Sequence, residues 1–196
     1  MGVLPAIKNV LLTPLVPLVI KHPSLQESWW FLLAMKRFPS SIAKTYDQRL
    51  TKDGVAYQEP IRKALENVQD SPSSLLDLCC GTGIATILAR HQFPEASITA
   101  VDQSKEMIQL CRQKVQEKHL TAIHLEVADA RALPYSDETF SLVLSSNAPV
   151  YLKEAVRVLK SRGTLIYTFS FAGRPFEKQK LPSFDCLLHI LWNLLT

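Results

Sequence analysis

Apolar residues between positions 74 and 169 follow two alternating patterns. Short apolar runs bounded by polar turns, too short for helices, are separated by longer stretches with apolar residues at helical spacing. The predicted strands are Leu75–Cys80, Ser97–Val101, Ile123–Val127, Phe140–Ser145 and Thr164–Phe169, and the predicted helices between them are Ile84–His91, Ser104–Lys118 and Tyr151–Leu159. This alternation predicts an α/β fold with a mostly parallel sheet covered by helices on both faces.

The segments on either side of this pattern do not show the alternation of short apolar runs and helical stretches. Residues 1–23 are apolar and interrupted by prolines, but Ser24-Leu-Gln-Glu27 matches a helix capping box, so we expect a helix over about 25–37. A second helix is expected over 55–69, and after Phe171 a loop followed by an apolar helix over Phe184–Leu195. We therefore expect three parts: an apolar, basic N-terminal segment (1–44), a core (45–171), and a C-terminal loop and helix (172–196).

The composition is typical of a single soluble domain, with 196 residues of which 47% are apolar and 20% charged. The net charge of +4 resides in residues 1–46, which hold five basic side chains and one acidic side chain. The remainder is balanced, so a nucleic-acid partner is not expected. The four cysteines lack metal-site spacing and indicate reduced thiols, no bound metal, and an intracellular location, cytoplasmic or peripheral to a membrane.

Gly81 and Gly83 are two of only six glycines, and both follow the first predicted strand. Glycines there allow a sharp turn and let a ligand approach the main chain before a helix begins. A phosphate-binding P-loop requires Gly-Lys-Ser/Thr, which does not occur in this chain. A dinucleotide fingerprint requires a third glycine where this chain has Thr86.

A third interpretation rests on acidic residues near strand ends. Asp77 lies near the end of the first predicted strand, Asp102 directly after the second, and Asp129 just past the third. Ligands of such sheets bind beyond the carboxyl ends of the strands, so the three acids predict one site. The chain here resembles class I S-adenosylmethionine-dependent methyltransferases, especially the small-molecule branch that includes the ubiquinone and menaquinone methyltransferases. The matching segments are LLDLCCGTGIAT (75–86), ITAVDQSKEM (98–107), VADARALPYSDETFSLVLSSN (127–147) and EAVRVLKSRGTLIYTF (154–169).

The resemblance implies a Rossmann-like, doubly wound sheet and S-adenosylmethionine as cofactor, bound by the core over residues 45–171. Asp77 would meet the amino group of the cofactor, Asp102 would accept both ribose hydroxyls, and Asp129 with the Ala130 amide would read the adenine edge. The other implied contacts are Cys79, Gly81, Thr82 and Gly83 along the methionine portion, Gln103 and Met107 flanking the adenine, Ser145 on the methyl-donor side, and Tyr46 closing over the cofactor.

Structural interpretations of the same residues stay open. Asp102 could cap a helix that begins at Gln103, and Asp129 could be a turn residue. Met107 could belong to the core, and Tyr46 could lack a cofactor contact. The loop cysteines are interpreted as small buried residues, not as nucleophiles.

The expected function is methyl transfer to a small acceptor, with a lipophilic one considered. The sulfonium cofactor is already activated, so the protein would chiefly align the reactants and exclude water. No histidine lies in a motif that identifies a general base, and no catalytic residue is named.

Two departures from the family support an alternative, a truncated or degenerate cofactor-binding protein without turnover. The segment Ser146–Glu154 is shorter than in relatives, and the 25 residues after Phe171 predict no C-terminal β-hairpin.

A membrane hypothesis comes from Trp29, Trp30 and Phe31, which stand close to two basic residues. Residues 1–38 could rest on an anionic membrane surface and admit a lipophilic acceptor. In the alternative, these aromatic residues pack on the sheet. No oligomeric state is predicted.

Overall fold

The computed structural model describes residues 54–148 and 151–168. The predicted helices over 25–37 and 184–195, Tyr46, the segment proposed to meet a membrane, and the question of a C-terminal hairpin lie outside these residues. The elements are α4 (Gly54–Glu66), β1 (Ser74–Leu78), α5 (Ile84–Gln92), β2 (Ser97–Asp102), α6 (Lys105–Glu117), β3 (Ile123–Val127), β4 (Phe140–Ser146), α7 (Leu152–Val158) and β5 (Leu159–Thr168).

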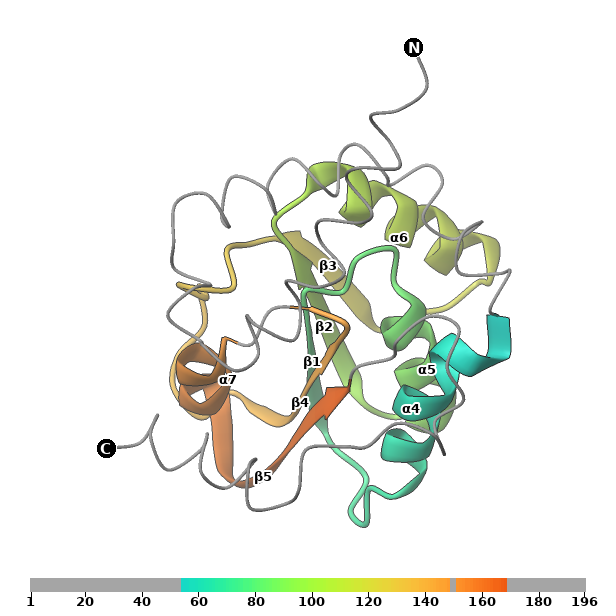
Figure 1. Ribbon diagram of the computed structural model, residues 1–196. Helices are drawn as coiled ribbons and strands as arrows, with labels where there is room; N and C mark the ends of the chain where they lie inside the picture. The colour runs from blue at the N-terminus through green and yellow to red at the C-terminus, as the bar shows by residue number, and fades with distance from the viewer. Residues whose placement is uncertain (1–53, 149–150, 169–196) are drawn as a thin grey trace, which may run out of the picture.

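The five strands form one parallel sheet in the order β3-β2-β1-β4-β5 (Figure 1). The chain first moves outward from β1 to β3 and then crosses back to β4 on the other side of β1. This reversal is the switch point at which doubly wound sheets bind ligands. The predicted α/β, doubly wound fold is confirmed.

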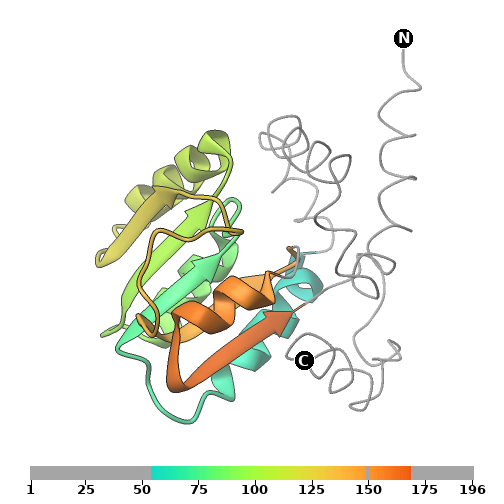
Figure 2. The ribbon, with the colours of Figure 1, turned by 90° about the vertical axis from the view of Figure 1, so that its left-hand side faces the viewer.

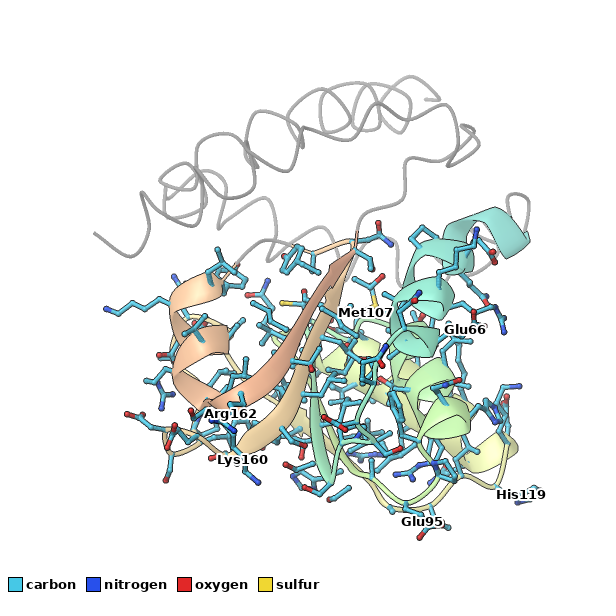
Figure 3. The ribbon with its side chains drawn as sticks, turned by 90° about the horizontal axis from the view of Figure 1, so that it is seen from below. Glu66, Glu95, Met107, His119, Lys160 and Arg162 are labelled. Carbon is cyan, nitrogen blue, oxygen red and sulfur yellow. The ribbon has the colours of Figure 1, made fainter. Side chains whose placement is uncertain are left out.

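Helices cover both faces of the sheet, as alternation along the strands requires. Leu75 belongs to a buried cluster with α4 and α5, and its neighbour Leu76 belongs to a cluster with α7. Figure 3 shows α7 on one side of the strands and α4 and α5 on the other. The strand arrows run in one general direction through the twisted sheet (Figure 2). All loops that follow strands therefore reach the same edge.

Strand β5 begins five residues earlier than the sequence predicts. Its pairing with β4 changes register between Phe140 and Leu142, because Phe140 lies opposite Leu159 and Leu142 lies opposite Thr164. The intervening polar residues accommodate a bulge in which Arg162 adopts a φ of +62°. An alternation pattern cannot reveal a strand segment interrupted in this way.

No helix among the described residues is long and apolar enough to cross a membrane.

Arg90 connects the turns that precede β2 and β3 at the amino-terminal edge of the sheet. Its buried guanidinium donates to four main-chain carbonyl groups, those of Phe93, Pro94, Ala96 and Ala122, over 2.6–3.3 Å. These carbonyls belong to the turns before β2 and β3. One planar group therefore holds four carbonyl groups of two turns together, including those of Phe93 and Ala122, which also accept from the backbone N–H groups of Ala96 and Ile98.

We expect Arg90→Lys to lower the free energy of unfolding by about 2–4 kcal/mol, because a single ammonium cannot serve four diverging carbonyls. Urea denaturation measures the change. The matched control is Arg112→Lys, at an exposed position with one long contact to Leu125 O of 3.4 Å, and it should change stability by less than about 0.5 kcal/mol. Equal effects of the two substitutions would refute the connecting role.

Candidate functional site

The loop from β1 to α5 has a left-handed backbone at three places, Cys79 (φ +60°), Gly81 (φ +55°) and Gly83 (φ +85°). Gly83 is the N-cap residue of α5, and a Cβ atom added to it would clash with the Sγ of Cys111 on α6. Gly81 has open space at the corresponding position. The two glycines thus differ in purpose: Gly83 allows close packing of the loop on α6, and Gly81 leaves the main chain accessible.

We expect Gly83→Ala to destabilise the protein much more than Gly81→Ala. Both substitutions place a side chain at positive φ, which costs about 1–2 kcal/mol. Only the substitution at Gly83 also creates a clash with Cys111, which should add about 1–3 kcal/mol. Thermal and urea denaturation of both variants test this, and equal destabilisation would show that packing on Cys111 is unimportant.

Asp77 is buried beneath this loop, at 1% exposure. The Thr86 hydroxyl donates to its Oδ2 over 2.5 Å, while Oδ1 is buried without a hydrogen-bond partner among the described residues. Burial raises the Asp77 pKa to about 7, and the nearby Asp102 acts in the same direction. The site therefore contains a carboxylate oxygen that can accept a hydrogen bond from a cationic group.

Asp102 joins the end of β2 to the glycine loop. Gly81 N donates to Oδ2, and Ser104 N donates to Oδ1, each over 2.9 Å. Burial raises the Asp102 pKa, and the two backbone hydrogen bonds oppose that rise. The helix-cap interpretation of Asp102 is wrong, because α6 begins at Lys105 and the Ser104 hydroxyl accepts from Met107 N instead.

Asp129 lies in the turn after β3 and is partly exposed. Its carboxylate accepts from the Arg131 backbone N over 2.9 Å and pairs with the Arg131 guanidinium. The hydrogen bonds from Arg131 hold the Asp129 pKa below its usual range. The interpretation of Asp129 as a turn residue is therefore confirmed in the structure. An adenine contact would require the carboxylate to share or release Arg131.

The remaining predicted residues occupy varied positions around this edge. Met107 is buried, at 4% exposure, whereas Gln103 is exposed. Ser145 is buried near the end of β4, and its hydroxyl has no hydrogen-bond partner among the described residues. It lies close enough to the Tyr167 hydroxyl to oppose the rise that burial causes in the Tyr167 pKa. The other members, Thr82 and Ala130, are buried.

The loop cysteines are not arranged as nucleophiles. Burial raises the pKa of the Cys79 thiol, and Asp102 and Asp77 raise it further. A contact with the Cys111 thiol, together with burial, raises the pKa of Cys80. A thiolate is therefore disfavoured at both positions. Among the described residues, no three His, Cys, Asp or Glu side chains are grouped to hold a metal ion.

Sequence reasoning missed two residues of the site. Thr86, considered only as a missing glycine, is completely buried and holds Asp77 through its hydroxyl. Tyr151 stands within electrostatic reach of Cys79, Asp129 and Asp102. A hydroxyl one helical turn into α5 and nine residues after a buried acid was a usable signal for Thr86. Tyr151 reaches the site only through tertiary structure.

Residues 75–163 match the model of a family described as a methyltransferase domain. Malonyl-[acyl-carrier protein] O-methyltransferase of Priestia megaterium is 31% identical over 151 residues, covering 74% of this chain and 54% of that protein. Demethylmenaquinone methyltransferase of Geobacillus is 38% identical over 108 residues, covering 51% of this chain and 46% of that protein. The chain thus spans about half the length of these curated relatives.

A solved structure supports the same fold. A candidate S-adenosyl-L-methionine-dependent methyltransferase of Methanococcus maripaludis has a TM-score of 0.59 with 22% identity, covering 66% of this chain and 63% of that one. At this identity the likeness concerns the fold. That protein is named for its dependence on S-adenosyl-L-methionine.

Proposed function

We propose that this chain is an S-adenosylmethionine-dependent methyltransferase acting on a small acceptor, because residues 75–163 match the model of a methyltransferase-domain family. The observation that carries the proposal is the pair of buried acids at the switch point of the sheet. Asp77 has a free carboxylate oxygen, and Asp102 binds the open glycine loop at Gly81. A cofactor with an ammonium group and a ribose diol fits these two acids.

The described residues fit the implied cofactor in three further respects. Among the described residues, no heavy atom lies within 4 Å of the place that a Gly81 Cβ atom would occupy, which leaves room for a ligand against the main chain. Each oxygen of Asp102 accepts one backbone N–H and can accept a second hydrogen bond, as a ribose diol requires. Asp129 and the Ala130 amide lie beyond β3, where the adenine would extend.

When bound, S-adenosylmethionine supplies an electrophilic methyl group. The residues of this chain would bind and orient it: Asp77 at the ammonium, Asp102 at the ribose, and the loop at Cys79–Gly83 along the methionine portion. Ser145 lines the sheet edge toward which the methyl group would face. This arrangement would contribute mainly by positioning the reactants and excluding water.

The acceptor is proposed to be a small molecule with a nucleophilic oxygen or carbon atom. The relatives are named as a malonyl-[acyl-carrier protein] O-methyltransferase and a demethylmenaquinone methyltransferase. The second name supports a small-molecule acceptor, and the first supports an oxygen atom as the nucleophile. A degenerate binder without turnover gains no support from these relatives or from the site, in which the acids and the glycine loop are retained.

Methyl transfer can be tested with labelled S-adenosylmethionine and a panel of quinols, phenols and malonyl thioesters. We expect label to enter one acceptor class, and transfer should depend on Asp102. Saturable cofactor binding without transfer to any acceptor, including fractionated cell extract, would favour the binder without turnover.

A contact with membranes is proposed for residues 1–38 on the basis of their basic charge and clustered aromatic residues. Co-sedimentation of the full chain and of residues 39–196 with anionic liposomes tests it. Stronger partitioning of the full chain is expected, and equal partitioning would remove the proposal. This contact would place the protein inside the cell at a membrane surface.

A further inference from the structure

Tyr151 precedes the first residue of α7 and occupies its N-cap position. Its carbonyl oxygen accepts from Ala155 N over 3.0 Å, so the first turn of the helix holds its main chain. Its side chain makes no capping hydrogen bond. Tyrosine is not a preferred N-cap residue, so the phenol does not serve as a hydrogen-bond acceptor for the backbone N–H groups of the first turn.

The ring lies over the margin of the apolar cluster between the sheet and α7. That cluster contains Ala130, and Cys79 and Ala128 also pack at its margin. Cys79 follows β1, whereas Ala128 and Ala130 follow β3. The half-buried ring is therefore placed at the edge where loops from different strands meet.

The hydroxyl group faces a mainly acidic environment. Burial raises the Tyr151 pKa, and Cys79, Asp129 and Asp102 raise it further, while Arg131 opposes them. Tyr167, from β5, is also within electrostatic reach. The phenol therefore stays protonated at neutral pH and can donate a hydrogen bond.

An adenosine group requires such a donor. Asp102 and Asp129 can only accept hydrogen bonds when ionised, which suits the ribose hydroxyls and the adenine amino group. The ribose oxygens and purine ring nitrogens are acceptors and need N–H or O–H groups. The Ala130 amide is one predicted donor, and the Tyr151 hydroxyl, near both acids, is a second.

We infer that Tyr151 is a cofactor-contact residue that covers the adenosine from the α7 side and donates its hydroxyl hydrogen bond to that group. This inference rests on the proposed function. Met107, labelled in Figure 3, belongs to α6 on the opposite face of the sheet from α7. The adenine would thus lie between a methionine from one face and an aromatic ring from the other.

The test compares full-length Tyr151→Phe and Tyr151→Leu with the unaltered chain. Calorimetry measures affinity for S-adenosylhomocysteine and for 5′-methylthioadenosine, which retains the adenosine group but lacks the amino-acid portion. Tyr151→Leu should weaken both ligands about tenfold or more, and Tyr151→Phe about threefold to tenfold, since it removes the hydroxyl alone.

Tyr135→Phe is the matched control. Tyr135 packs at the same apolar cluster, its ring meets Phe140 edge to face, and its hydroxyl donates to Glu126 over 2.7 Å. This variant should bind both ligands within twofold of the unaltered chain. A loss equal to that of Tyr151→Phe would overturn the inference, because general loosening of the cluster would then explain both.

The outcomes separate this inference from the proposed function. If the unaltered chain binds neither ligand, the cofactor proposal fails and this inference with it. If Asp102→Ala abolishes binding while both Tyr151 variants bind normally, the inference alone is wrong. If Tyr151→Leu melts far below the unaltered chain, Tyr151→Phe decides: weakened adenosine binding supports the contact and unchanged binding refutes it.

Discussion

Replacing Asp77 with asparagine is expected to remove a pH-dependent destabilisation of the protein without cofactor. The Asp77 pKa is about 7 in the folded chain, against 3.8 for an unperturbed aspartate. Because the folded chain holds the Asp77 proton more tightly than the unfolded chain does, the free energy of unfolding is highest below about pH 4. It falls as the pH rises through 7. Relative to Asp77→Asn, the unaltered protein should lose at most about 4 kcal/mol of unfolding free energy between pH 4 and pH 8.

The same substitution should nearly abolish cofactor binding, because the amide presents no charge to the cofactor ammonium. In the unaltered chain the ammonium favours the ionised carboxylate, so affinity should rise by up to tenfold per pH unit below 7 and level off above it. In Asp77→Asn the affinity should be low and this rise absent. Urea denaturation and calorimetry across pH 5–8 measure both effects.

The charged neighbour of Asp77 makes a suitable control. Asp102 raises the Asp77 pKa, so Asp102→Asn should shift the stability transition of Asp77 to lower pH without removing it. The unaltered protein is compared with Asp77→Asn at pH 4 and pH 8. An unchanged difference in their unfolding free energies would contradict a raised pKa of the buried Asp77 carboxylate.

Asp102→Ala is the second substitution with a large expected effect, a loss of cofactor affinity of about 100-fold or more. Two hydrogen bonds from a ribose diol to a carboxylate are worth about 1.5–3 kcal/mol each. The substitution also frees Gly81 N, whose 2.9 Å hydrogen bond to Oδ2 connects the loop to β2. Loss of ribose binding and loosening of the loop therefore act in the same direction.

A ribose-modified ligand separates these two causes. The unaltered chain should prefer S-adenosylhomocysteine over its 2′-deoxy analogue by about tenfold, whereas Asp102→Ala should bind both equally weakly. Asp137→Ala removes an exposed carboxylate paired with Arg157, and it should leave affinity and preference unchanged. Retained preference for the 2′-hydroxyl in Asp102→Ala would show that Asp102 acts on the loop alone.

β2 and β4 were predictable because their buried runs have few polar interruptions, and β3 because its apolar residues alternate with polar ones. β3 matches its predicted bounds, and β2 and β4 differ by a single residue. β5 begins at Leu159 because it contains a bulge of polar residues at its start, which no apolar pattern can mark. The helix over 55–69 ends at Glu66, before a polar turn.

The site was predictable to the extent that parallel strands bring their ends together. Asp77 and Asp102 meet through the glycine loop, as their placement near strand ends implied. The pairing of Asp129 with Arg131 depends on a side-chain conformation, and the position of Tyr151 depends on where α7 begins in space. Neither follows from spacing along the chain.

One calorimetric comparison tests whether the site takes S-adenosylmethionine or a dinucleotide. Thr86 occupies the position of the third glycine and is completely buried beside Asp77, to which its hydroxyl donates a hydrogen bond. The full-length chain should bind one equivalent of S-adenosylmethionine and show no heat with NAD⁺ at the same concentration. Saturable binding of NAD⁺ without binding of S-adenosylmethionine would show that the site takes a dinucleotide instead.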